Sequence, residues 1–193
     1  MEEFYSLQGE GYHTGSAAWF IRIGGCDVGC SWCDVKESWN ATFFPPKDTD
    51  LLVSRALECP AKAVILTGGE PLQYNLDYLC RQLRTKDLKT FLETSGSKPL
   101  SGSWDWICLS PKPEWPPREE FYTLANELKM IIFNKEDLNW AETQSEKVRP
   151  EAKLFLQPEW SQRETILPVI ISYIQTHHKW KLSIQAHKYI GIP

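Results

Sequence analysis

The sequence has no apolar run long enough to cross a lipid bilayer, which takes about 20 consecutive apolar residues. It also has no excess of basic residues: the formal net charge is −4, whereas a nucleic-acid-binding surface needs a basic footprint. No internal repeat and no low-complexity segment interrupts the 193 residues. Length and ordinary composition therefore predict one globular domain, residues 1–193, whose partners include neither a membrane nor a nucleic acid.

The sequence shows no secretory signal peptide and no disulfide framework, although it contains six cysteines. Three of them, Cys59, Cys80 and Cys108, occur singly in apolar segments. Isolated cysteines in such segments behave as small hydrophobic residues. We therefore expect buried free thiols in a reducing compartment and a cytoplasmic protein.

The other three cysteines form a Cys-x-x-x-Cys-x-x-Cys run at Cys26, Cys30 and Cys33. Thiolates are the usual ligands of iron–sulfur clusters, and a 4Fe–4S cluster normally takes four of them. A run of three leaves one iron open to a small molecule, which favours catalysis over simple electron transfer. The run resembles the signature of the radical S-adenosylmethionine superfamily, in which the open iron binds S-adenosylmethionine.

A structural zinc site is the main alternative for this run, because zinc is also held by clustered cysteines. Such a site needs four tetrahedral ligands. The nearest candidates for the fourth, His13, Cys59 and Cys80, lie in segments without zinc-knuckle spacing. The cluster is therefore the favoured interpretation.

Short apolar segments alternate with helical patterns along the chain. The patterns predict strands at 17–23, 62–67, 89–93, 104–109, 127–133, 153–157 and 180–185, and helices at 49–58, about 76–83, 135–146 and 168–177. Alternation of this kind gives an α/β fold with a parallel sheet. A closed eight-fold barrel takes about 250 residues. We therefore predict a partial, splayed (β/α) barrel with reduced helix content, whose ligands lie at the carboxyl ends of the strands.

Polar motifs follow four of these predicted strands. They are Thr67-Gly68-Gly69-Glu70-Pro71, Glu93-Thr94-Ser95-Gly96, Ser110-Pro111-Lys112-Pro113 and Gln157-Pro158. A lone glycine pair or lysine in a loop is usually an ordinary turn or solvated surface. Their repetition at successive strand ends indicates a binding site, and the first motif resembles the Gly-Gly-Glu-Pro segment that binds the amino end of S-adenosylmethionine in radical enzymes.

Both chain ends carry further motifs, although terminal segments are usually the least ordered parts of a domain. Residues 4–11 read Phe-Tyr-Ser-Leu-Gln-Gly-Glu-Gly, and residues 184–193 read Ile-Gln-Ala-His-Lys-Tyr-Ile-Gly-Ile-Pro. With the cysteine run and the strand-end motifs, they resemble the 7-carboxy-7-deazaguanine synthase family over essentially the whole chain. The resemblance implies conversion of 6-carboxy-5,6,7,8-tetrahydropterin to 7-carboxy-7-deazaguanine with loss of ammonia, in the biosynthesis of queuosine and related 7-deazapurines.

The resemblance also implies roles for individual residues. Cys26, Cys30 and Cys33 would hold the cluster. The S-adenosylmethionine site would be lined by Trp32, Gly69, Glu70, Ser110, Pro111, Lys112, Gln157 and Pro158. The pterin would be surrounded by Leu7, Gln8, Gly9, Glu10, Arg22, Thr67, His187 and the terminal Pro193. The remaining histidines, His13, His177 and His178, are expected at the surface.

Physical chemistry supports three of the substrate roles. A guanidinium binds a carboxylate with two hydrogen bonds, which suits Arg22 in its otherwise apolar strand, although an outward-facing residue of an alternating strand would look the same. A guanine-like ring edge offers N–H donors to Glu10 and a carbonyl to Gln8. Many members of the family carry Thr or Ser after the Cys-Asp pair as a magnesium ligand, whereas this chain has Val35, so magnesium remains possible but without that oxygen.

The family further implies an electron donor such as a flavodoxin or ferredoxin, and a homodimer. Two alternatives stay open. A radical enzyme that activates a glycyl radical enzyme would share Cys26, Cys30, Cys33 and Glu70, but not the motifs at the chain ends. An iron–sulfur electron carrier or zinc-binding module would require a fourth cysteine ligand and no S-adenosylmethionine pocket.

Overall fold

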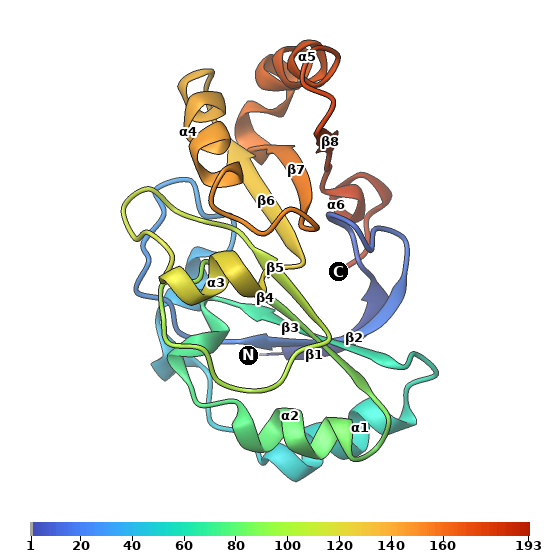
Figure 1. Cartoon of the computed structure of the whole chain (residues 1–193). Coiled ribbons are helices and arrows are strands. Elements are labelled where there is room, and N and C mark those ends of the chain that lie inside the picture. The colour runs from blue at the N-terminus through green and yellow to red at the C-terminus, as the bar shows by residue number, and fades with distance from the viewer. Residues whose placement is uncertain (1) are drawn as a thin grey trace.

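The computed structural model describes residues 2–193 as one eight-stranded sheet, in the order β1-β2-β3-β4-β5-β6-β7-β8. Figure 1 shows the strands curving into an open barrel, with helices on the outside. The strands are β1 (Glu2–Leu7), β2 (Ala17–Ile23), β3 (Ala63–Gly68), β4 (Lys89–Thr94), β5 (Trp106–Leu109), β6 (Glu127–Ile132), β7 (Lys153–Pro158) and β8 (Trp180–Leu182). The predicted fold class, a splayed partial barrel, is confirmed.

The helices are short and do not follow every strand. They are α1 (Thr49–Glu58), α2 (Asp77–Arg84), α3 (Glu119–Leu124), α4 (Glu136–Ser145), α5 (Arg163–Ile174) and α6 (Ala186–Ile190), with short 3-10 turns at Lys36–Trp39, Ala41–Phe43, Pro71–Gln73 and Trp160–Gln162. β4 runs to β5 without a helix, as the reduced helix content predicts. Among residues 2–193, no helix is both long and apolar enough to span a bilayer.

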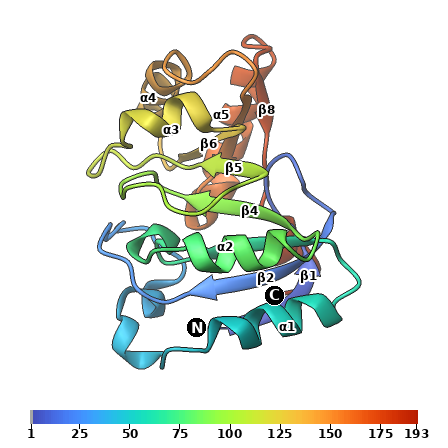
Figure 2. The same cartoon turned by 60° about the horizontal axis from the view of Figure 1, so that its bottom comes forward.

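The sheet packs differently on its two faces. Its outer face forms the main core with the helices, where Leu66, Leu92 and Met130 are fully buried. Figure 2 shows α1 and α2 side by side across this face. The inner face has a small apolar cluster of Ala18, Phe20 and Ile65. Because side chains alternate along a strand, the polar residues of the inner face continue this row toward the carboxyl ends.

Two predicted boundaries need correction. The helix expected at 168–177 begins at Arg163 and contains Pro168. Pro168 and Glu164, whose carbonyl loses its hydrogen-bond donor, are both exposed, so water can satisfy that carbonyl and the helix continues. The last strand ends at Leu182 rather than at residue 185: Ser183 N still donates to Leu156 O, but Ala186 N then donates to Gly9 O, so the chain has left the sheet.

The N-terminal strand and two short helices were missed. β1 pairs antiparallel with β2, whereas all other neighbours in the sheet are parallel. Its residues were interpreted only as a cover over the site, since its alternation is partly masked by exposed aromatic residues such as Tyr5. α3 and α6 are too short, at six and five residues, to show a helical period.

Candidate active site

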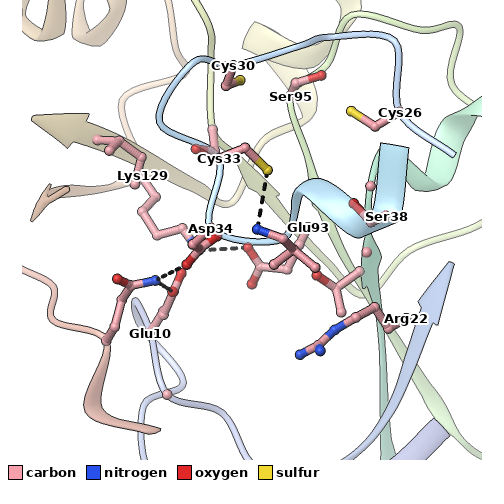
Figure 3. Close-up of a pocket in the computed structure, with 18 of the residues that line it drawn as sticks. Glu10, Arg22, Cys26, Cys30, Cys33, Asp34, Ser38, Glu93, Ser95 and Lys129 are labelled. Atoms are coloured by element: carbon pink, nitrogen blue, oxygen red, sulfur yellow. Dashed lines mark hydrogen bonds and ion pairs between the residues drawn. The ribbon is translucent and has the colours of Figure 1, made fainter. Parts of the chain in front are cut away.

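A large cavity opens at the carboxyl ends of the parallel strands, where the sequence places the polar motifs. Every predicted site residue except Pro111, which is buried beside Ser110, lines this cavity. The lining comes from β1 to β4, β6 and β7, the segment after β5, the cysteine loop and the C-terminal segment. Figure 3 shows the cysteine loop arching over one side of the cavity, with Lys129 and Glu10 on the other. The structure thus brings together segments that lie more than 150 residues apart.

The three clustered cysteines are half-buried free thiols on one wall of the cavity. Burial raises the pKa values of Cys26 and Cys30. Cys33 Sγ accepts a hydrogen bond from the backbone of Val35 at 3.4 Å. Within residues 2–193 no three His, Cys, Asp or Glu side chains converge on one point as a preformed metal site. The donor set nevertheless fits an iron–sulfur cluster: three thiols, all on one short loop and all facing one cavity.

The glycine turn after β3 brings backbone close to the cysteine loop. A side chain at Gly68 (φ 132°) would place its Cβ 2.1 Å from the carbonyl oxygen of Ile23. At Gly69 a Cβ would lie 2.2 Å from the carbonyl oxygen of Gly25 and 2.9 Å from the Cβ of Cys26. Only glycine fits at these positions. The turn therefore sets the distance between the Gly-Gly segment and the first cysteine.

Glu70 is fully buried and already saturated with hydrogen bonds. Oε1 accepts from Leu72 N (3.1 Å) and Thr94 Oγ1 (2.7 Å), and Oε2 accepts from Ser95 N (2.9 Å) and Ser95 Oγ (2.5 Å). These four bonds use the acceptor sites of a carboxylate. Glu70 thus joins the glycine turn to the end of β4, and its carboxylate shapes this wall of the cavity.

Lys112 lies across the cavity from the turn. Its Nζ donates to Ser110 O (2.6 Å) and Ser110 Oγ (2.8 Å), and it stands 5.5 Å from the ring centre of Trp32. Burial lowers the pKa of Lys112. The predicted Ser-Pro-Lys motif therefore places a cation and an aromatic ring from the cysteine loop next to each other.

A buried lysine that the motif analysis missed lies at the centre of the cavity floor. Lys129, on β6, pairs with Glu10 at 2.6 Å and with Glu93 at 2.8 Å, and its side chain is only 6% exposed. The available signal was a single charge inside the apolar segment Leu128–Ile132, the same pattern that singled out Arg22. Burial opposes ionisation of Glu10, but the charge and hydrogen bond of Lys129, with a bond from Gln185, lower the pKa of Glu10 to about 2.

Arg22 lies on the inner face of β2 and reaches the cavity from the side of β1. It pairs with Glu2 at 2.5 Å and lies over the ring of Phe4, 5.2 Å from its centre. Its side chain is 28% exposed. The guanidinium is thus held near the cavity, but one of its faces is already used by a carboxylate of the chain itself.

The C-terminal segment crosses the cavity and meets the N-terminal motif. Ala186 N donates to Gly9 O at 2.8 Å, and a side chain at Gly9 would collide with the ring of His187. Burial lowers the pKa of His187. At the far end, Ser6 Oγ donates to Pro193 O at 3.2 Å. Gly9 is thus required for the close approach of the two ends.

This segment also contacts the cysteine loop. Lys188 forms an ion pair with Asp34, and Gln185 Nε2 donates to both Asp34 (3.2 Å) and Glu10 (3.0 Å). Lys188 Nζ also stands 4.8 Å from the ring centre of Trp160, which follows β7. The cysteine loop, the N-terminal motif and the end of β7 are therefore tied together by one stretch of chain.

The remaining predicted residues show two different arrangements. Gln157 is buried, and its Oε1 accepts from Ser183 Oγ at 2.7 Å, so its carbonyl side is used by the chain itself. Pro158, Leu7, Thr67 and Val35 line the cavity. The side chain of Val35 contributes no oxygen to this wall.

One expectation about the histidines is wrong. His177 and His178 are exposed, as predicted, but His13 is half-buried and stacks on Phe91, with ring centres 4.7 Å apart. Its ring edge also meets Trp106. The loop after β1 folds back under the sheet through the bond from Gly15 N to Gln8 O, which carries His13 inward. Sequence pattern alone does not reveal such a return.

Comparison with known proteins agrees with this geometry. A model of the radical SAM superfamily matches residues 20–109. The chain is 54% identical to the 7-carboxy-7-deazaguanine synthase of Flavobacterium psychrophilum, over all of this chain and 91% of the relative. It is 49% identical to that of Synechocystis sp., over 99% of this chain and 91% of the relative.

A solved structure shows the same likeness in three dimensions. The crystal structure of QueE from Escherichia coli superposes with a TM-score of 0.82 at 29% identity, over 96% of this chain and 92% of that one. Identities of this size over whole chains, with the radical SAM match across the cysteine run, leave no other family to consider. The chain belongs to the 7-carboxy-7-deazaguanine synthase family of radical S-adenosylmethionine enzymes.

Proposed function

We propose that this enzyme, acting as a single domain, converts 6-carboxy-5,6,7,8-tetrahydropterin to 7-carboxy-7-deazaguanine with loss of ammonia; the names of its relatives give the product of this reaction. One observation carries the proposal. The cysteine loop, the Gly-Gly turn and both chain ends, which hold the family's motifs, face one cavity. A separate cofactor site and substrate site could not support radical transfer between them, whereas one shared cavity can.

The residues fit the cofactors in the following way. Cys26, Cys30 and Cys33 would hold a 4Fe–4S cluster, and S-adenosylmethionine would lie against Gly69, Trp32 and Lys112. When bound, these groups supply the radical that removes a hydrogen atom from the substrate. Ser110, Gln157 and Pro158 would complete this side. Glu70, whose carboxylate is saturated, would act by holding the turn, and Pro111 by supporting Ser110.

The chain's own groups orient the pterin. Arg22 would bind the substrate carboxylate, and Glu10 and Gln8 the polar edge of the pyrimidine ring, since they offer acceptors and an amide. Leu7, Gly9, Thr67, His187 and Pro193 would enclose it. The two chain ends lie over the cavity and bond to each other, which restricts water around a reactive substrate.

Magnesium would have to be bound differently from the family's usual arrangement. Val35 offers no oxygen, so water and the substrate would supply most of the ligands. Asp34 follows Cys33 but is paired with Lys188. We therefore expect turnover to depend only weakly on added magnesium, which a titration in chelated buffer measures; a strict requirement would show that the ion is held by other groups.

The partners follow from the same proposal. A flavodoxin-like or ferredoxin-like protein would supply electrons, and the functional unit would be a homodimer, which sedimentation tests directly. All six cysteines are free, and three of them are buried, which suits a reducing compartment such as the cytoplasm.

The decisive experiment is an anaerobic assay of the reconstituted protein with the tetrahydropterin, S-adenosylmethionine and a chemical reductant. We expect one deazaguanine product and one ammonia for each pterin consumed. Reductive cleavage of S-adenosylmethionine without any pterin-dependent product would favour a glycyl radical activase instead. Iron loading without S-adenosylmethionine binding would leave only an electron carrier.

A further inference from the structure

Lys129 is a buried cation among several carboxylates inside the sheet's curve. Its side chain projects from β6 between Glu10, on the loop after β1, and Glu93, on β4. Glu127, two residues before Lys129 on β6, is a third buried carboxylate on this face. An uncompensated pair of carboxylates here would be costly, because like charges repel strongly where water is scarce.

Glu10, Lys129, Glu93 and Gln8 close a ring of hydrogen bonds. Lys129 Nζ donates to Glu10 Oε2 (2.6 Å) and to Glu93 Oε2 (2.8 Å). Gln8 Nε2 donates to Glu93 Oε1 (3.0 Å), and Gln8 Oε1 accepts from the backbone of Glu10 (3.2 Å). The ring therefore fixes both carboxylates relative to each other and to the N-terminal motif.

The ring leaves acceptor capacity on the cavity side. The second oxygen of Glu10 accepts one bond, from Gln185 Nε2 at 3.0 Å. A carboxylate oxygen has two acceptor sites, so neither Oε1 of Glu10 nor Oε1 of Glu93 is saturated by these bonds. Glu10 and Glu93 line the cavity, as Glu70 does. They differ from Glu70 in that its four acceptor sites are already occupied.

From this geometry we infer that Lys129 is the positioning residue of the substrate site: it holds Glu10 and Glu93 oriented so that they receive the adjacent N–H donors of the substrate's pyrimidine ring. The inference rests on the proposed function for the identity of the substrate. A 2-aminopyrimidinone edge presents an exocyclic amine and a ring N–H side by side, which two fixed acceptors match. Lys129 acts through these carboxylates and does not itself contact the reacting atoms.

The test compares ligand binding by three variants of the reconstituted protein. Equilibrium dialysis measures the affinity for 6-carboxypterin, a stable oxidised analogue with the same ring edge and carboxylate, and separately for S-adenosylmethionine. Lys129→Met should lower the affinity for 6-carboxypterin by about tenfold or more, a typical loss when a supporting contact is removed. The affinity for S-adenosylmethionine should stay within about twofold of the wild-type value. Lys129→Arg, which keeps the charge, should recover part of the loss. Lys153→Met, on the neighbouring strand and exposed, is the matched control.

Each result either supports or overturns the positioning role of Lys129. Wild-type pterin affinity in Lys129→Met, or equal loss of both ligands, would overturn the inference while leaving the proposed function intact. If Lys129→Met does not fold, adding Glu93→Gln restores the net charge of the group; wild-type affinity in that double variant would equally overturn it. If the wild-type protein neither binds the pterin nor converts the tetrahydropterin, the proposed function fails first, and the inference falls with it.

Discussion

Buried charge on the inner face of the sheet distinguishes this cavity from an ordinary core. Lys129 and Glu127 lie on β6 where alternation along the strand would otherwise place apolar side chains, Glu10 meets Lys129 from the loop after β1, and each of the three costs desolvation. Breaking such a pair by removing one partner typically costs about 3–5 kcal/mol. Because the fold tolerates this cost in stability, we expect the buried charges to serve the function of the protein. Here they surround the proposed pterin site.

Glu127 provides a test through pH. Burial, followed by repulsion from Glu93, raises its pKa to about 7, although Lys129 and bonds from Tyr12 N and Trp106 Nε1 act in the opposite direction. A carboxyl whose folded pKa lies above its unfolded value of 4.5 stabilises the fold below pH 4.5, and this contribution is lost as pH rises through 7.

We therefore expect Glu127→Gln to gain stability relative to the wild type as pH rises from about 5 to 8, by up to about 3 kcal/mol. Denaturant unfolding of both proteins across this range measures the difference. A constant difference between the two proteins at every pH would show that Glu127 titrates normally.

The clustered and isolated cysteines should respond differently to removal. Cys30→Ala should abolish iron loading and turnover, because two thiols cannot hold the cluster that three hold. Cys80→Ala, at a fully buried core position, should load iron normally and lose about 1 kcal/mol of stability. Iron analysis after anaerobic reconstitution and thermal unfolding separate the two effects. Full activity of Cys30→Ala would refute the radical mechanism.

Arg22 should distinguish the substrate from the cofactor. Arg22→Lys keeps the charge but loses the two-pronged geometry, so 6-carboxypterin should bind about tenfold more weakly while S-adenosylmethionine is unaffected. Glu2→Gln, which removes the present partner of Arg22, should leave pterin binding unchanged or stronger. Equilibrium dialysis with each ligand measures the affinity for 6-carboxypterin and the affinity for S-adenosylmethionine. An equal loss for the two ligands in Arg22→Lys would assign Arg22 a structural role.

At the scale of single elements, turns and helix caps determine where the motif after each strand lies. Gly68 and Gly69 allow β3 to pass within contact distance of the residues that lead into the cysteine loop. The N-cap of α1 is Asp48, whose side chain accepts from Asp50 N (2.8 Å) and Leu51 N (3.2 Å). This helix carries the chain from the cysteine loop back to β3.

Asp48→Ala should destabilise the protein by about 1 kcal/mol, because it removes the acceptor for two unpaired backbone donors. Asp48→Asn, which keeps a side-chain oxygen, is the control and should cost much less. Chemical denaturation measures both, and iron loading should be unchanged. Equal stability of Asp48→Ala and the wild type would mean that water replaces the cap.

At the scale of the whole molecule, the two chain ends cover the side of the cavity that the parallel strands leave open. β1 adds an antiparallel edge next to β2, and α6 crosses toward it (Figure 1). Helix α6 has no fully buried residue, so it contributes little to the core. Its contacts with Gly9 and Asp34 belong to the cavity instead.

Deleting residues 186–193 should therefore leave the fold and iron loading nearly unchanged but abolish pterin binding. Circular dichroism, iron analysis and dialysis with 6-carboxypterin report the three properties on one sample. Retained pterin affinity would show that the C-terminal segment covers the cavity without contributing to the site. Loss of iron loading together with pterin binding would show that the ion pair between Lys188 and Asp34 is needed to hold the cysteine loop.

Local pattern predicted most of the sheet. Strand β3 is a nearly continuous apolar run because both faces of a parallel sheet are covered, and helices such as α2 carry a clear period. The motifs that follow these strands could be assigned to one edge, since parallel strands end on the same side. The position of His13 and the antiparallel pairing of β1 could not, because they depend on contacts with distant segments.

The sequence by itself determined the family, the cysteine run and the motif residues that line the cavity, because these are written in spacing and residue type, but not Lys129. Tertiary structure alone decided which of those residues already have partners. Glu70 is saturated, Arg22 is paired with Glu2, and Lys129 joins Glu10 to Glu93 across the sheet. A hydrogen bond or ion pair between residues 20 to 119 positions apart exists only when the backbone has closed that distance, so no local pattern could show it.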